Sequence, residues 1–264
     1  MADLLDKIVE NTRRQVQERK SLKSFTAIEK AAFEKSKPYN FEAALNKNYP
    51  SIIAECKKMS PSKGVLTNDY NPVQLATQYE EAGVSAISCL TDETFFGGTL
   101  ADLVAIRSKT KTPLLRKDFI IDEYQIFEAR AAGADSFLLL SGVLNQNQLQ
   151  KFIALGRELK MEPLVESHTQ DQLEAAVAAG AKILGINNRN LKTFETSLDH
   201  SLKMAAYLKQ TKLQPLLVCE SGIENRGDIV QMWKAGYKAF LIGETLVRAD
   251  SPKDLIRLFS KPVD

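Results

Sequence analysis

The stretch Leu114–Ile120, with the sequence LLRKDFI, places an apolar run that ends in a lysine directly before a turn and a predicted helix. This order is typical of a barrel strand that delivers a reactive side chain at its carboxyl end. Lys117 has the apolar Leu115, Phe119 and Ile120 near it in sequence. Because an ammonium group partly removed from water has a lowered pKa, these neighbours predict that Lys117 donates a proton near neutral pH. An isolated lysine is more commonly a solvated residue at a strand end, so the assignment depends on the rest of the chain.

The same pattern recurs along most of the chain. From residue 51 onward, short apolar runs of strand type alternate with helical segments. The runs cover residues 52–55, 84–90, 113–117, 136–140, 162–166, 183–187, 216–220 and 239–242, and the helical segments cover residues 72–82, 99–108, 123–132, 146–160, 170–179, 198–209, 226–235 and 253–259. Near-continuously apolar strands separated by helices require parallel pairing with both faces of the sheet covered. We therefore predict an α/β fold in which residues 49–264 form a closed (β/α)8 TIM barrel.

An open doubly wound sheet is the alternative arrangement for this alternation. Such a sheet normally carries a glycine-rich dinucleotide fingerprint after its first strand. Here the corresponding turn, residues 60–64, reads SPSKG, which favours the barrel. Ahead of the barrel, residues 3–20 have apolar side chains at helical spacing, and residues 25–47 predict a second helical stretch. Residues 1–48 are therefore expected to form an N-terminal helical extension.

The composition argues against several classes of protein. A chain of 264 residues with 44% hydrophobic and 26% charged residues is ordinary for a soluble globular protein. A formal net charge of +2 without a basic tract does not favour nucleic-acid binding. The three cysteines, at positions 56, 89 and 219, are too widely spaced for a disulfide framework or a zinc motif. The charged N-terminal residues lack the apolar segment of a signal peptide, and no long uncharged run is present, so we expect a cytoplasmic protein without a membrane partner.

Acids, bases and amides gather where the predicted strands end. They are Glu55, Lys57, Lys117, Glu166, Asn187, Arg189, Glu220 and Ser221. In a closed barrel these strand ends and the following loops meet at one face and build the active site. Side chains two apart in a strand share a face, so Glu55 and Lys57 should both point into the barrel mouth. A neutralised ion-pair network is the alternative role for these charges, but buried charge networks are a poor way to gain stability, so a catalytic role is favoured.

Two glycine-containing turns near the C-terminus predict a phosphate site. ESGI, residues 220–223, and LIGETL, residues 241–246, follow the last two strands, whose loops often hold a phosphate in such barrels. Gly222 and Gly243 would let the backbone approach an anion closely, and Ser60 would add a hydroxyl group from the first loop. Glycine is also common at such turns for conformational reasons alone.

The aromatic residues and histidines divide into two groups. Phe96 and Phe119 fall just beyond strand ends, where an aromatic side chain can cover a flat substrate ring. His168 and His200 lack metal-ligand spacing, and neither is expected to act directly in catalysis. No metal site is predicted.

Several ordered motifs resemble those of the indole-3-glycerol phosphate synthase family. They are AECKK (residues 54–58) with SPSKG (60–64), LRKDF (115–119), LVE (164–166), GINNRNL (185–191) and ESGI (220–223). The resemblance extends from the N-terminal helices to the last barrel helix. It implies a carboxy-lyase of tryptophan biosynthesis that converts 1-(2-carboxyphenylamino)-1-deoxyribulose 5-phosphate to indole-3-glycerol phosphate, with loss of CO2 and water and without a metal or organic cofactor. It also implies that residues 1–48 pack over the barrel mouth or form a dimer contact, so a monomer or a weak homodimer is expected.

The resemblance implies a role for each predicted site residue. Lys117 would be the general acid that protonates the substrate carbonyl, Lys57 would bind the anthranilate carboxylate, and Glu166 would act on the dehydration step. The residues that would orient these groups and the substrate hydroxyls are Glu55, Asn187, Glu220 and Ser221. The substrate pocket would include Arg189 and Phe119, and the phosphate site would include Ser60, Gly222 and Gly243. Glu244 stands where some members have a serine, so its backbone N–H, rather than its carboxylate, is expected to face the phosphate.

Two other functions fit parts of the pattern. A phosphosugar isomerase or a Schiff-base aldolase on the same barrel would use Lys117 as its nucleophile. A non-catalytic phosphometabolite-binding protein would keep the phosphate loops without the chemistry. The presence of Lys57, Lys117 and Glu166 together favours an enzyme.

Overall fold

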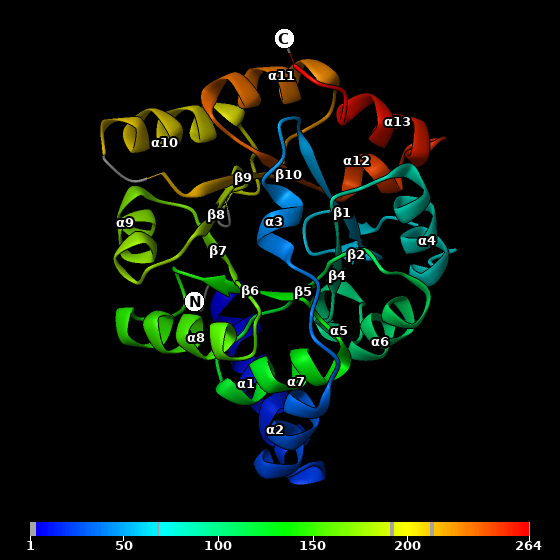
Figure 1. The fold of residues 1–264 in the computed structure, drawn as a ribbon, viewed down its shortest axis with the longest axis vertical. Helices are drawn as coiled ribbons and strands as arrows, with labels where there is room; N and C mark the ends of the chain where they lie inside the picture. Colours follow the sequence, from blue (N-terminus) through cyan, green and yellow to red (C-terminus); the bar gives the residue numbers. More distant parts are fainter. Residues whose placement is uncertain (1–3, 68, 191–192, 212–213, 264) are drawn as a thin grey trace.

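The computed structural model describes residues 4–67, 69–190, 193–211 and 214–263. Within these ranges, parallel strands close into a barrel in the order β1-β10-β9-β8-β7-β6-β5-β4 (Figure 1). The strands are β1 (Ser51–Cys56), β4 (Ala86–Leu90), β5 (Leu114–Lys117), β6 (Ser136–Leu140), β7 (Leu164–Ser167), β8 (Ile183–Asn187), β9 (Leu216–Glu220) and β10 (Ala239–Ile242). The predicted barrel and each of its strands are confirmed. Residues 1–3 and 264 of the predicted regions, and Leu191 of the GINNRNL motif, lie outside the described residues.

The predicted barrel helices are all present, and each end lies within two residues of its predicted position. They are α4 (Pro72–Ala82), α6 (Leu100–Lys109), α7 (Glu123–Ala132), α8 (Gln146–Glu158), α9 (Gln170–Ala178), α10 (Leu198–Gln210), α11 (Arg226–Ala235) and α13 (Pro252–Phe259). Helix α4 shows why the ends of these helices can be predicted from the sequence. The side chain of Asn71 accepts a hydrogen bond from the backbone N–H of Gln74, Pro72 occupies the first turn, and Gly83 ends the helix at a left-handed φ of 86°.

The N-terminal extension differs from its prediction in one respect. It contains α1 (Leu4–Leu22), α2 (Phe25–Glu34) and α3 (Phe41–Leu45), so the predicted helical stretch 25–47 is two helices rather than one. Pro38 lies in the break, where proline disfavours a helical conformation in the residue before it. Asn40 then begins α3 by accepting a hydrogen bond from the backbone N–H of Ala43.

Four short elements in the loops were not predicted. β2 (Met59–Ser60) and β3 (Gly64–Val65) pair as an antiparallel hairpin after β1, while α5 (Glu93–Phe96) follows β4 and α12 (Glu244–Val247) follows β10. Each of these elements is too short to show a hydrophobic period. They nevertheless matter for function, since all of them belong to loops at the carboxyl ends of the strands.

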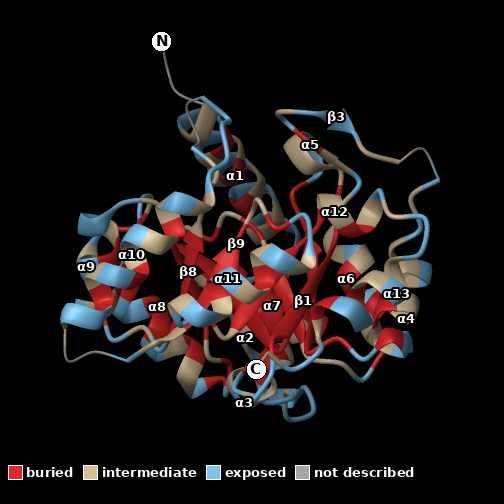
Figure 2. Ribbon diagram, turned by 90° about the horizontal axis from the view of Figure 1, so that it is seen from above, coloured by how far each residue is buried: buried red, intermediate tan, exposed pale blue. Residues whose placement is uncertain are grey.

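The extension covers both ends of the barrel. Figure 2 shows α1 on the same side of the barrel as α5 and β3, and α3 on the opposite side. Phe41 and Leu45 of α3 are buried in the cluster that fills the barrel interior. Leu4, Leu5 and Ile8 of α1 line a cavity at the other end. The extension therefore closes the bottom of the barrel with α3 and helps to roof its mouth with α1.

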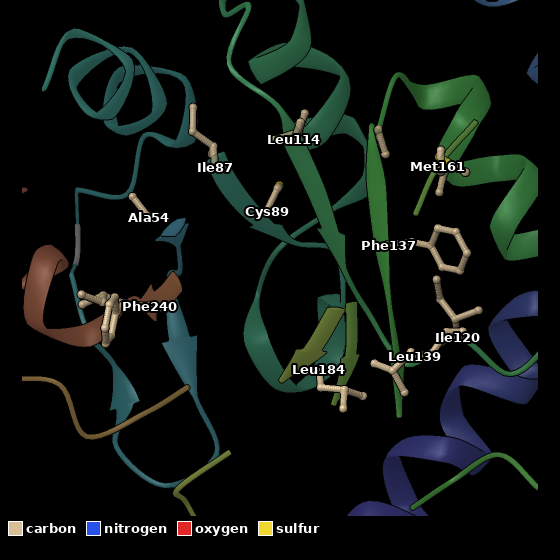
Figure 3. Close-up of a cluster of buried hydrophobic side chains, with 14 of the residues drawn as sticks. Ala54, Ile87, Cys89, Leu114, Ile120, Phe137, Leu139, Met161, Leu184 and Phe240 are labelled. Atoms are coloured by element: carbon tan, nitrogen blue, oxygen red, sulfur yellow. The ribbon is translucent and has the colours of Figure 1, made fainter. Parts of the chain in front are cut away.

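Alternation along the strands divides the core into two layers. Ile52, Ala54 and Cys56 of β1 belong to the outer cluster between strands and helices, part of which is drawn in Figure 3. Ile53 of the same strand belongs to the interior cluster. Since side chains two apart share a face, the next inward position after Ile53 is Glu55. The same step leads from interior residues of other strands to polar groups: Leu115 to Lys117, Leu164 to Glu166, Ile183 through Gly185 to Asn187, and Val218 to Glu220.

Candidate active site

Charged side chains from different strands meet at the carboxyl end of the barrel. The ammonium nitrogen Nζ of Lys117 lies 3.1 Å from Oε2 of Glu166 and 3.0 Å from Oε2 of Glu220. Lys57 Nζ lies 2.9 Å from Oε1 of Glu55. The three glutamates are buried, and the Lys117 side chain is only 13% exposed. The structure thus brings together the strand-end charges that the sequence predicted.

The predicted acidity of Lys117 is wrong in direction. Burial alone would lower the pKa of Lys117, but the carboxylates of Glu166 and Glu220 outweigh it and raise this pKa above its ordinary value. The residues near Lys117 in sequence are apolar and predicted a lowered pKa. The two carboxylates that raise this pKa come from β7 and β9, which are distant in sequence. Lys117 is therefore a firmly protonated ammonium group in the free site.

The two carboxylates beside Lys117 differ in their proton affinity. Burial disfavours the charged form of Glu166, but Lys117, His168 and Asn187 together hold the pKa of Glu166 well below its ordinary value. Burial raises the pKa of Glu220 to about 8, with Lys117 opposing the rise and Glu166 adding to it. The two carboxylates therefore differ in charge: Glu166 stays ionised in the free site, whereas Glu220 binds a proton more readily.

The central cavity holds most of the predicted site. Its predicted members are Glu55, Lys57, Ser60, Phe96, Lys117, Phe119, Glu166, Asn187, Arg189, Glu220 and Ser221. The rings of Phe96 and Phe119 lie 6.0 Å apart between centroids and are inclined by 35°. Lys57 Nζ lies 5.9 Å from the Phe96 ring centroid. This wall of the cavity therefore offers two aromatic faces and a cation, which suits a flat ring that carries an anionic group.

A side cavity adjoins the central cavity and holds the remaining predicted residues. Gly222, Gly243 and Glu244 line it, and Arg189 and Ser221 line both cavities. Ser221 has a left-handed φ of 65° and Gly222 one of 83°, so the loop after β9 adopts a backbone conformation that most residues avoid. At Gly243, a side-chain methyl would come within 2.5 Å of Oε1 of Glu55. Glycine at 243 therefore leaves room for the Glu55 carboxylate.

The carboxylate of Glu244 forms ion pairs with lysine and arginine side chains. Its Oε1 accepts from Lys63 Nζ at 2.7 Å and from Arg248 Nε at 3.1 Å, and its Oε2 lies 3.7 Å from Nη2 of Arg189. Arg189 also donates to the hydroxyl of Ser62 at 2.9 Å. These contacts tie the loop after β1 to the loops after β8 and β10. The Glu244 carboxylate is thus occupied by cationic side chains in the free site.

Several polar atoms of the site lack a partner. Among the described residues, Glu55 Oε2, Ser60 Oγ, Arg189 Nε and Glu220 Oε1 are buried without a hydrogen bond. Buried polar groups are almost always hydrogen-bonded in folded proteins, so a cluster of exceptions in one place indicates a site prepared for a polar ligand.

Sequence reasoning missed some residues of the site. Leu4, Ile8 and Phe194 line the central cavity, and Lys63 lines the side cavity. His168, which was expected to stay outside the chemistry, places Nε2 2.9 Å from Oε1 of Glu166. Its position two residues after Glu166 was the available signal, because a polar pair at that spacing at a strand end can share a face.

A closed barrel with a charged and partly aromatic cavity at the carboxyl ends of its strands defines an enzyme of the (β/α)8 barrel class. Among solved structures, that of 3-hexulose-6-phosphate synthase matches 81% of this chain and 100% of its own, with a TM-score of 0.61 and 14% sequence identity. At this identity the match supports the fold alone.

Sequence comparison identifies the family. The family described as indole-3-glycerol phosphate synthase matches residues 5–259. The chain is 43% identical over 256 residues to the indole-3-glycerol phosphate synthase of Albidiferax ferrireducens, with 96% of each chain covered. It is 43% identical over 255 residues to that of Carboxydothermus hydrogenoformans, with 94% of this chain and 96% of the relative covered. The chain belongs to the indole-3-glycerol phosphate synthase family, and its activity is the carboxy-lyase reaction of that family in tryptophan biosynthesis.

No helix in the described ranges is both long and apolar enough to cross a membrane. In the same part of the chain, no group of three or more His, Cys, Asp or Glu side chains is arranged to hold a metal ion.

Proposed function

We propose that the central cavity converts 1-(2-carboxyphenylamino)-1-deoxyribulose 5-phosphate to indole-3-glycerol phosphate, with Lys117 as the general acid. The observation that carries this proposal is the position of the Lys117 ammonium between Glu166 and Glu220. Ring closure turns a ketone into an alcohol, so the carbonyl oxygen needs a proton as the aromatic carbon attacks. The raised pKa keeps Lys117 protonated until substrate arrives. The developing alkoxide is a much stronger base than either carboxylate and takes the proton.

Lys57 binds the anthranilate carboxylate in this proposal. Its ammonium lies beside the Phe96 ring, and Phe96 and Phe119 form the aromatic wall that would cover the anthranilate ring. An aromatic ring on this wall therefore has a cation within reach of a substituent carboxylate. Glu55 holds the Lys57 ammonium in place from the opposite direction.

In the dehydration step Lys57, whose ammonium is paired with Glu55, protonates the departing hydroxyl group so that it leaves as water, while Glu166 acts as the base and takes a proton from the neighbouring ring carbon. The low pKa of Glu166 keeps it ionised, and Asn187 donates to its Oε1 at 3.0 Å, which orients the carboxylate. Glu220 orients the Lys117 ammonium through their 3.0 Å contact, and Ser221 presents its hydroxyl group from the strained turn that follows.

The phosphate binds in the side cavity. Gly222 and Gly243 supply backbone N–H groups there, Glu244 supplies its own N–H, and Ser60 and Arg189 supply side-chain donors from the central cavity. The unpartnered Ser60 Oγ and Arg189 Nε support this assignment.

Residues 1–48 act as a cover and residues 49–264 as the catalytic barrel of one domain. The described part of the extension supports this division, because α3 packs into the barrel interior and α1 lines the central cavity. We place the protein in the cytoplasm as a monomer or weak homodimer that acts on a small phosphorylated substrate, without a nucleic-acid or membrane partner and without a cofactor. Its near-neutral net charge and its unpaired, buried cysteines support this setting.

The test is the rise of indole fluorescence when purified protein meets the carboxyphenylamino substrate in the presence of EDTA. We expect turnover with the chelator present, and no adduct on Lys117 after borohydride treatment with substrate. Folded protein that binds the substrate without forming indole would overturn the proposal. A borohydride-trapped Lys117 adduct would replace the general-acid role with Schiff-base chemistry.

A further inference from the structure

The carboxylate of Glu166 is held from three directions. Lys117 contacts its Oε2 at 3.1 Å, and Asn187 Nδ2 donates to its Oε1 at 3.0 Å. His168, in the loop between β7 and α9, places Nε2 2.9 Å from the same Oε1. The three partners come from β5, from β8 and from the loop after β7, so together they leave the carboxylate little rotational freedom.

The hydrogen-bond pattern assigns the proton on the His168 ring. An ionised Glu166 can only accept, so Nε2 of His168 carries the hydrogen and donates it. Nδ1 is buried and has no hydrogen-bond partner among the described residues. The backbone N–H of His168 donates to Oε1 of Gln172 on α9 at 2.8 Å, which fixes the loop that carries the ring. The one hydrogen bond of the imidazole is thus directed at Glu166.

We propose that His168 is a positioning residue for the reaction, which holds Glu166 ionised and in one orientation while Lys117 is without its proton. This inference rests on the role of Glu166 in dehydration proposed above. Ring closure consumes the Lys117 proton, and the resulting neutral amine no longer balances the charge on Glu166. The donors that remain at Oε1 are then His168 and Asn187. His168 therefore matters most after ring closure, when Glu166 has to act.

Neighbouring charges do not substitute for His168. The other titratable and charged groups that line the cavities around Glu166 are Glu55, Lys57, Lys117, Asp118, Arg189, Glu195, His200 and Glu220. Apart from Lys117, which pairs with Glu166, and Glu220, whose pKa Glu166 raises through its charge and a side-chain hydrogen bond, none of these has a hydrogen bond or ion pair to Glu166 in the described structure. His200 on α10 shares a neighbouring cavity with His168 and makes no contact with Glu166, so it serves as a matched control.

The experiment compares CO2 release with indole formation in single turnovers. In the proposed reaction, loss of CO2 from the attacking ring carbon restores the aromatic ring and comes before loss of water. Slow dehydration therefore releases about one equivalent of CO2 in a burst before indole fluorescence appears. We expect His168→Leu to show this burst, with kcat lowered about tenfold and KM within about twofold. His168→Gln, whose amide nitrogen can occupy the place of Nε2, should restore near-normal kcat and remove the burst. His200→Leu should show no burst.

The outcomes show whether His168 positions Glu166 and whether Glu166 acts in dehydration. Equal rates of CO2 and indole formation in His168→Leu overturn the inference, as does a burst of the same size in both His168→Leu and His168→Gln. His168→Asn, whose shorter amide does not reach Glu166, replaces the leucine variant if that variant does not fold, and the same criteria apply. Glu166→Gln separates the two proposals: a burst in Glu166→Gln but not in the His168 variants refutes only the role of His168. The absence of a burst in Glu166→Gln refutes the assignment of Glu166 to dehydration.

Discussion

Replacing Lys117 with methionine removes the cation between two buried carboxylates and keeps most of the length of the side chain. Lys117 Nζ lies 3.1 Å from Glu166 and 3.0 Å from Glu220, and these glutamates are 5% and 1% exposed. Removing one partner of a buried ion pair costs about 3 to 5 kcal/mol, because a buried charge is left uncompensated. In Lys117→Met the two carboxylates relieve part of this cost by binding a proton, which raises the pKa of the pair.

The stability loss in Lys117→Met should therefore depend on pH. A carboxyl group whose pKa is raised by folding binds more protons in the folded than in the unfolded state, so the free energy of unfolding falls as pH rises through this range. The wild type already contains one such group, Glu220, with its pKa raised to about 8. We expect the difference in unfolding free energy between wild type and variant to be larger at about pH 8 than at about pH 5.5. Urea unfolding at these two values measures it.

Turnover should fall far more than affinity. A positioned general acid contributes about a hundredfold to ten-thousandfold in rate, so kcat should drop at least about a hundredfold. The cations assigned to the substrate anions, Lys57 and Arg189, remain in place, so the substrate dissociation constant should stay within about tenfold, or about 1.4 kcal/mol. Indole fluorescence measures turnover, and equilibrium dialysis measures binding. A preserved kcat with a large loss of binding would refute the reasoning and make Lys117 an anion anchor.

Other parts of the structure give predictions of their own. A methyl group on Gly185 would overlap Oε1 of Glu220, so Gly185→Ala should lower kcat at least about tenfold at a stability cost of about 1 to 3 kcal/mol; unchanged kcat would show that Glu220 can move freely. Glu244→Gln leaves Lys63 and its neighbouring arginines uncompensated, so inhibition by inorganic phosphate should strengthen by about fivefold. Weaker inhibition would mean that the carboxylate organises the anion site. Phe41→Ala should cost about 3 to 5 kcal/mol in urea unfolding without changing KM, because Phe41 fills the barrel end opposite the site; a changed KM would contradict this separation.

Local sequence patterns are enough to predict most strands and helices of this fold. The barrel strands are mostly buried and mostly apolar, as in β1 and β6, and helices such as α4 and α7 end at left-handed glycines that mark their boundaries. Apolar residues on both sides of Pro38 predict one helix, but the proline disfavours a helical conformation in the residue before it and so separates α2 from α3. The hairpin β2–β3 and helices α5 and α12 have two to four residues each, which is less than one period of any hydrophobic pattern.

The sequence predicts which residues line the cavity, but it does not predict the direction of the Lys117 pKa shift. The alternation of β1, continued one residue past its end, places Glu55 and Lys57 on one face, and the two side chains form an ion pair in the structure. The environment of Lys117 could not be read locally, because Glu166 and Glu220 lie 49 and 103 residues further along the chain. The shift of the Lys117 pKa follows from barrel closure, which no window of sequence contains.

The ion pairs of the free site affect how strongly the enzyme binds the substrate relative to the transition state. Lys57 is paired with Glu55, Lys117 with Glu166 and Glu220, and Lys63 with Glu244. The cations are therefore oriented before substrate arrives, which reduces reorganisation during the reaction. The same pairing makes an incoming carboxylate or phosphate compete with internal carboxylates, so ground-state binding is weaker than the number of cations suggests. Proton transfer from Lys117 to the alkoxide meets no such competitor, because no internal carboxylate is as basic, and the arrangement favours the transition state over the bound substrate.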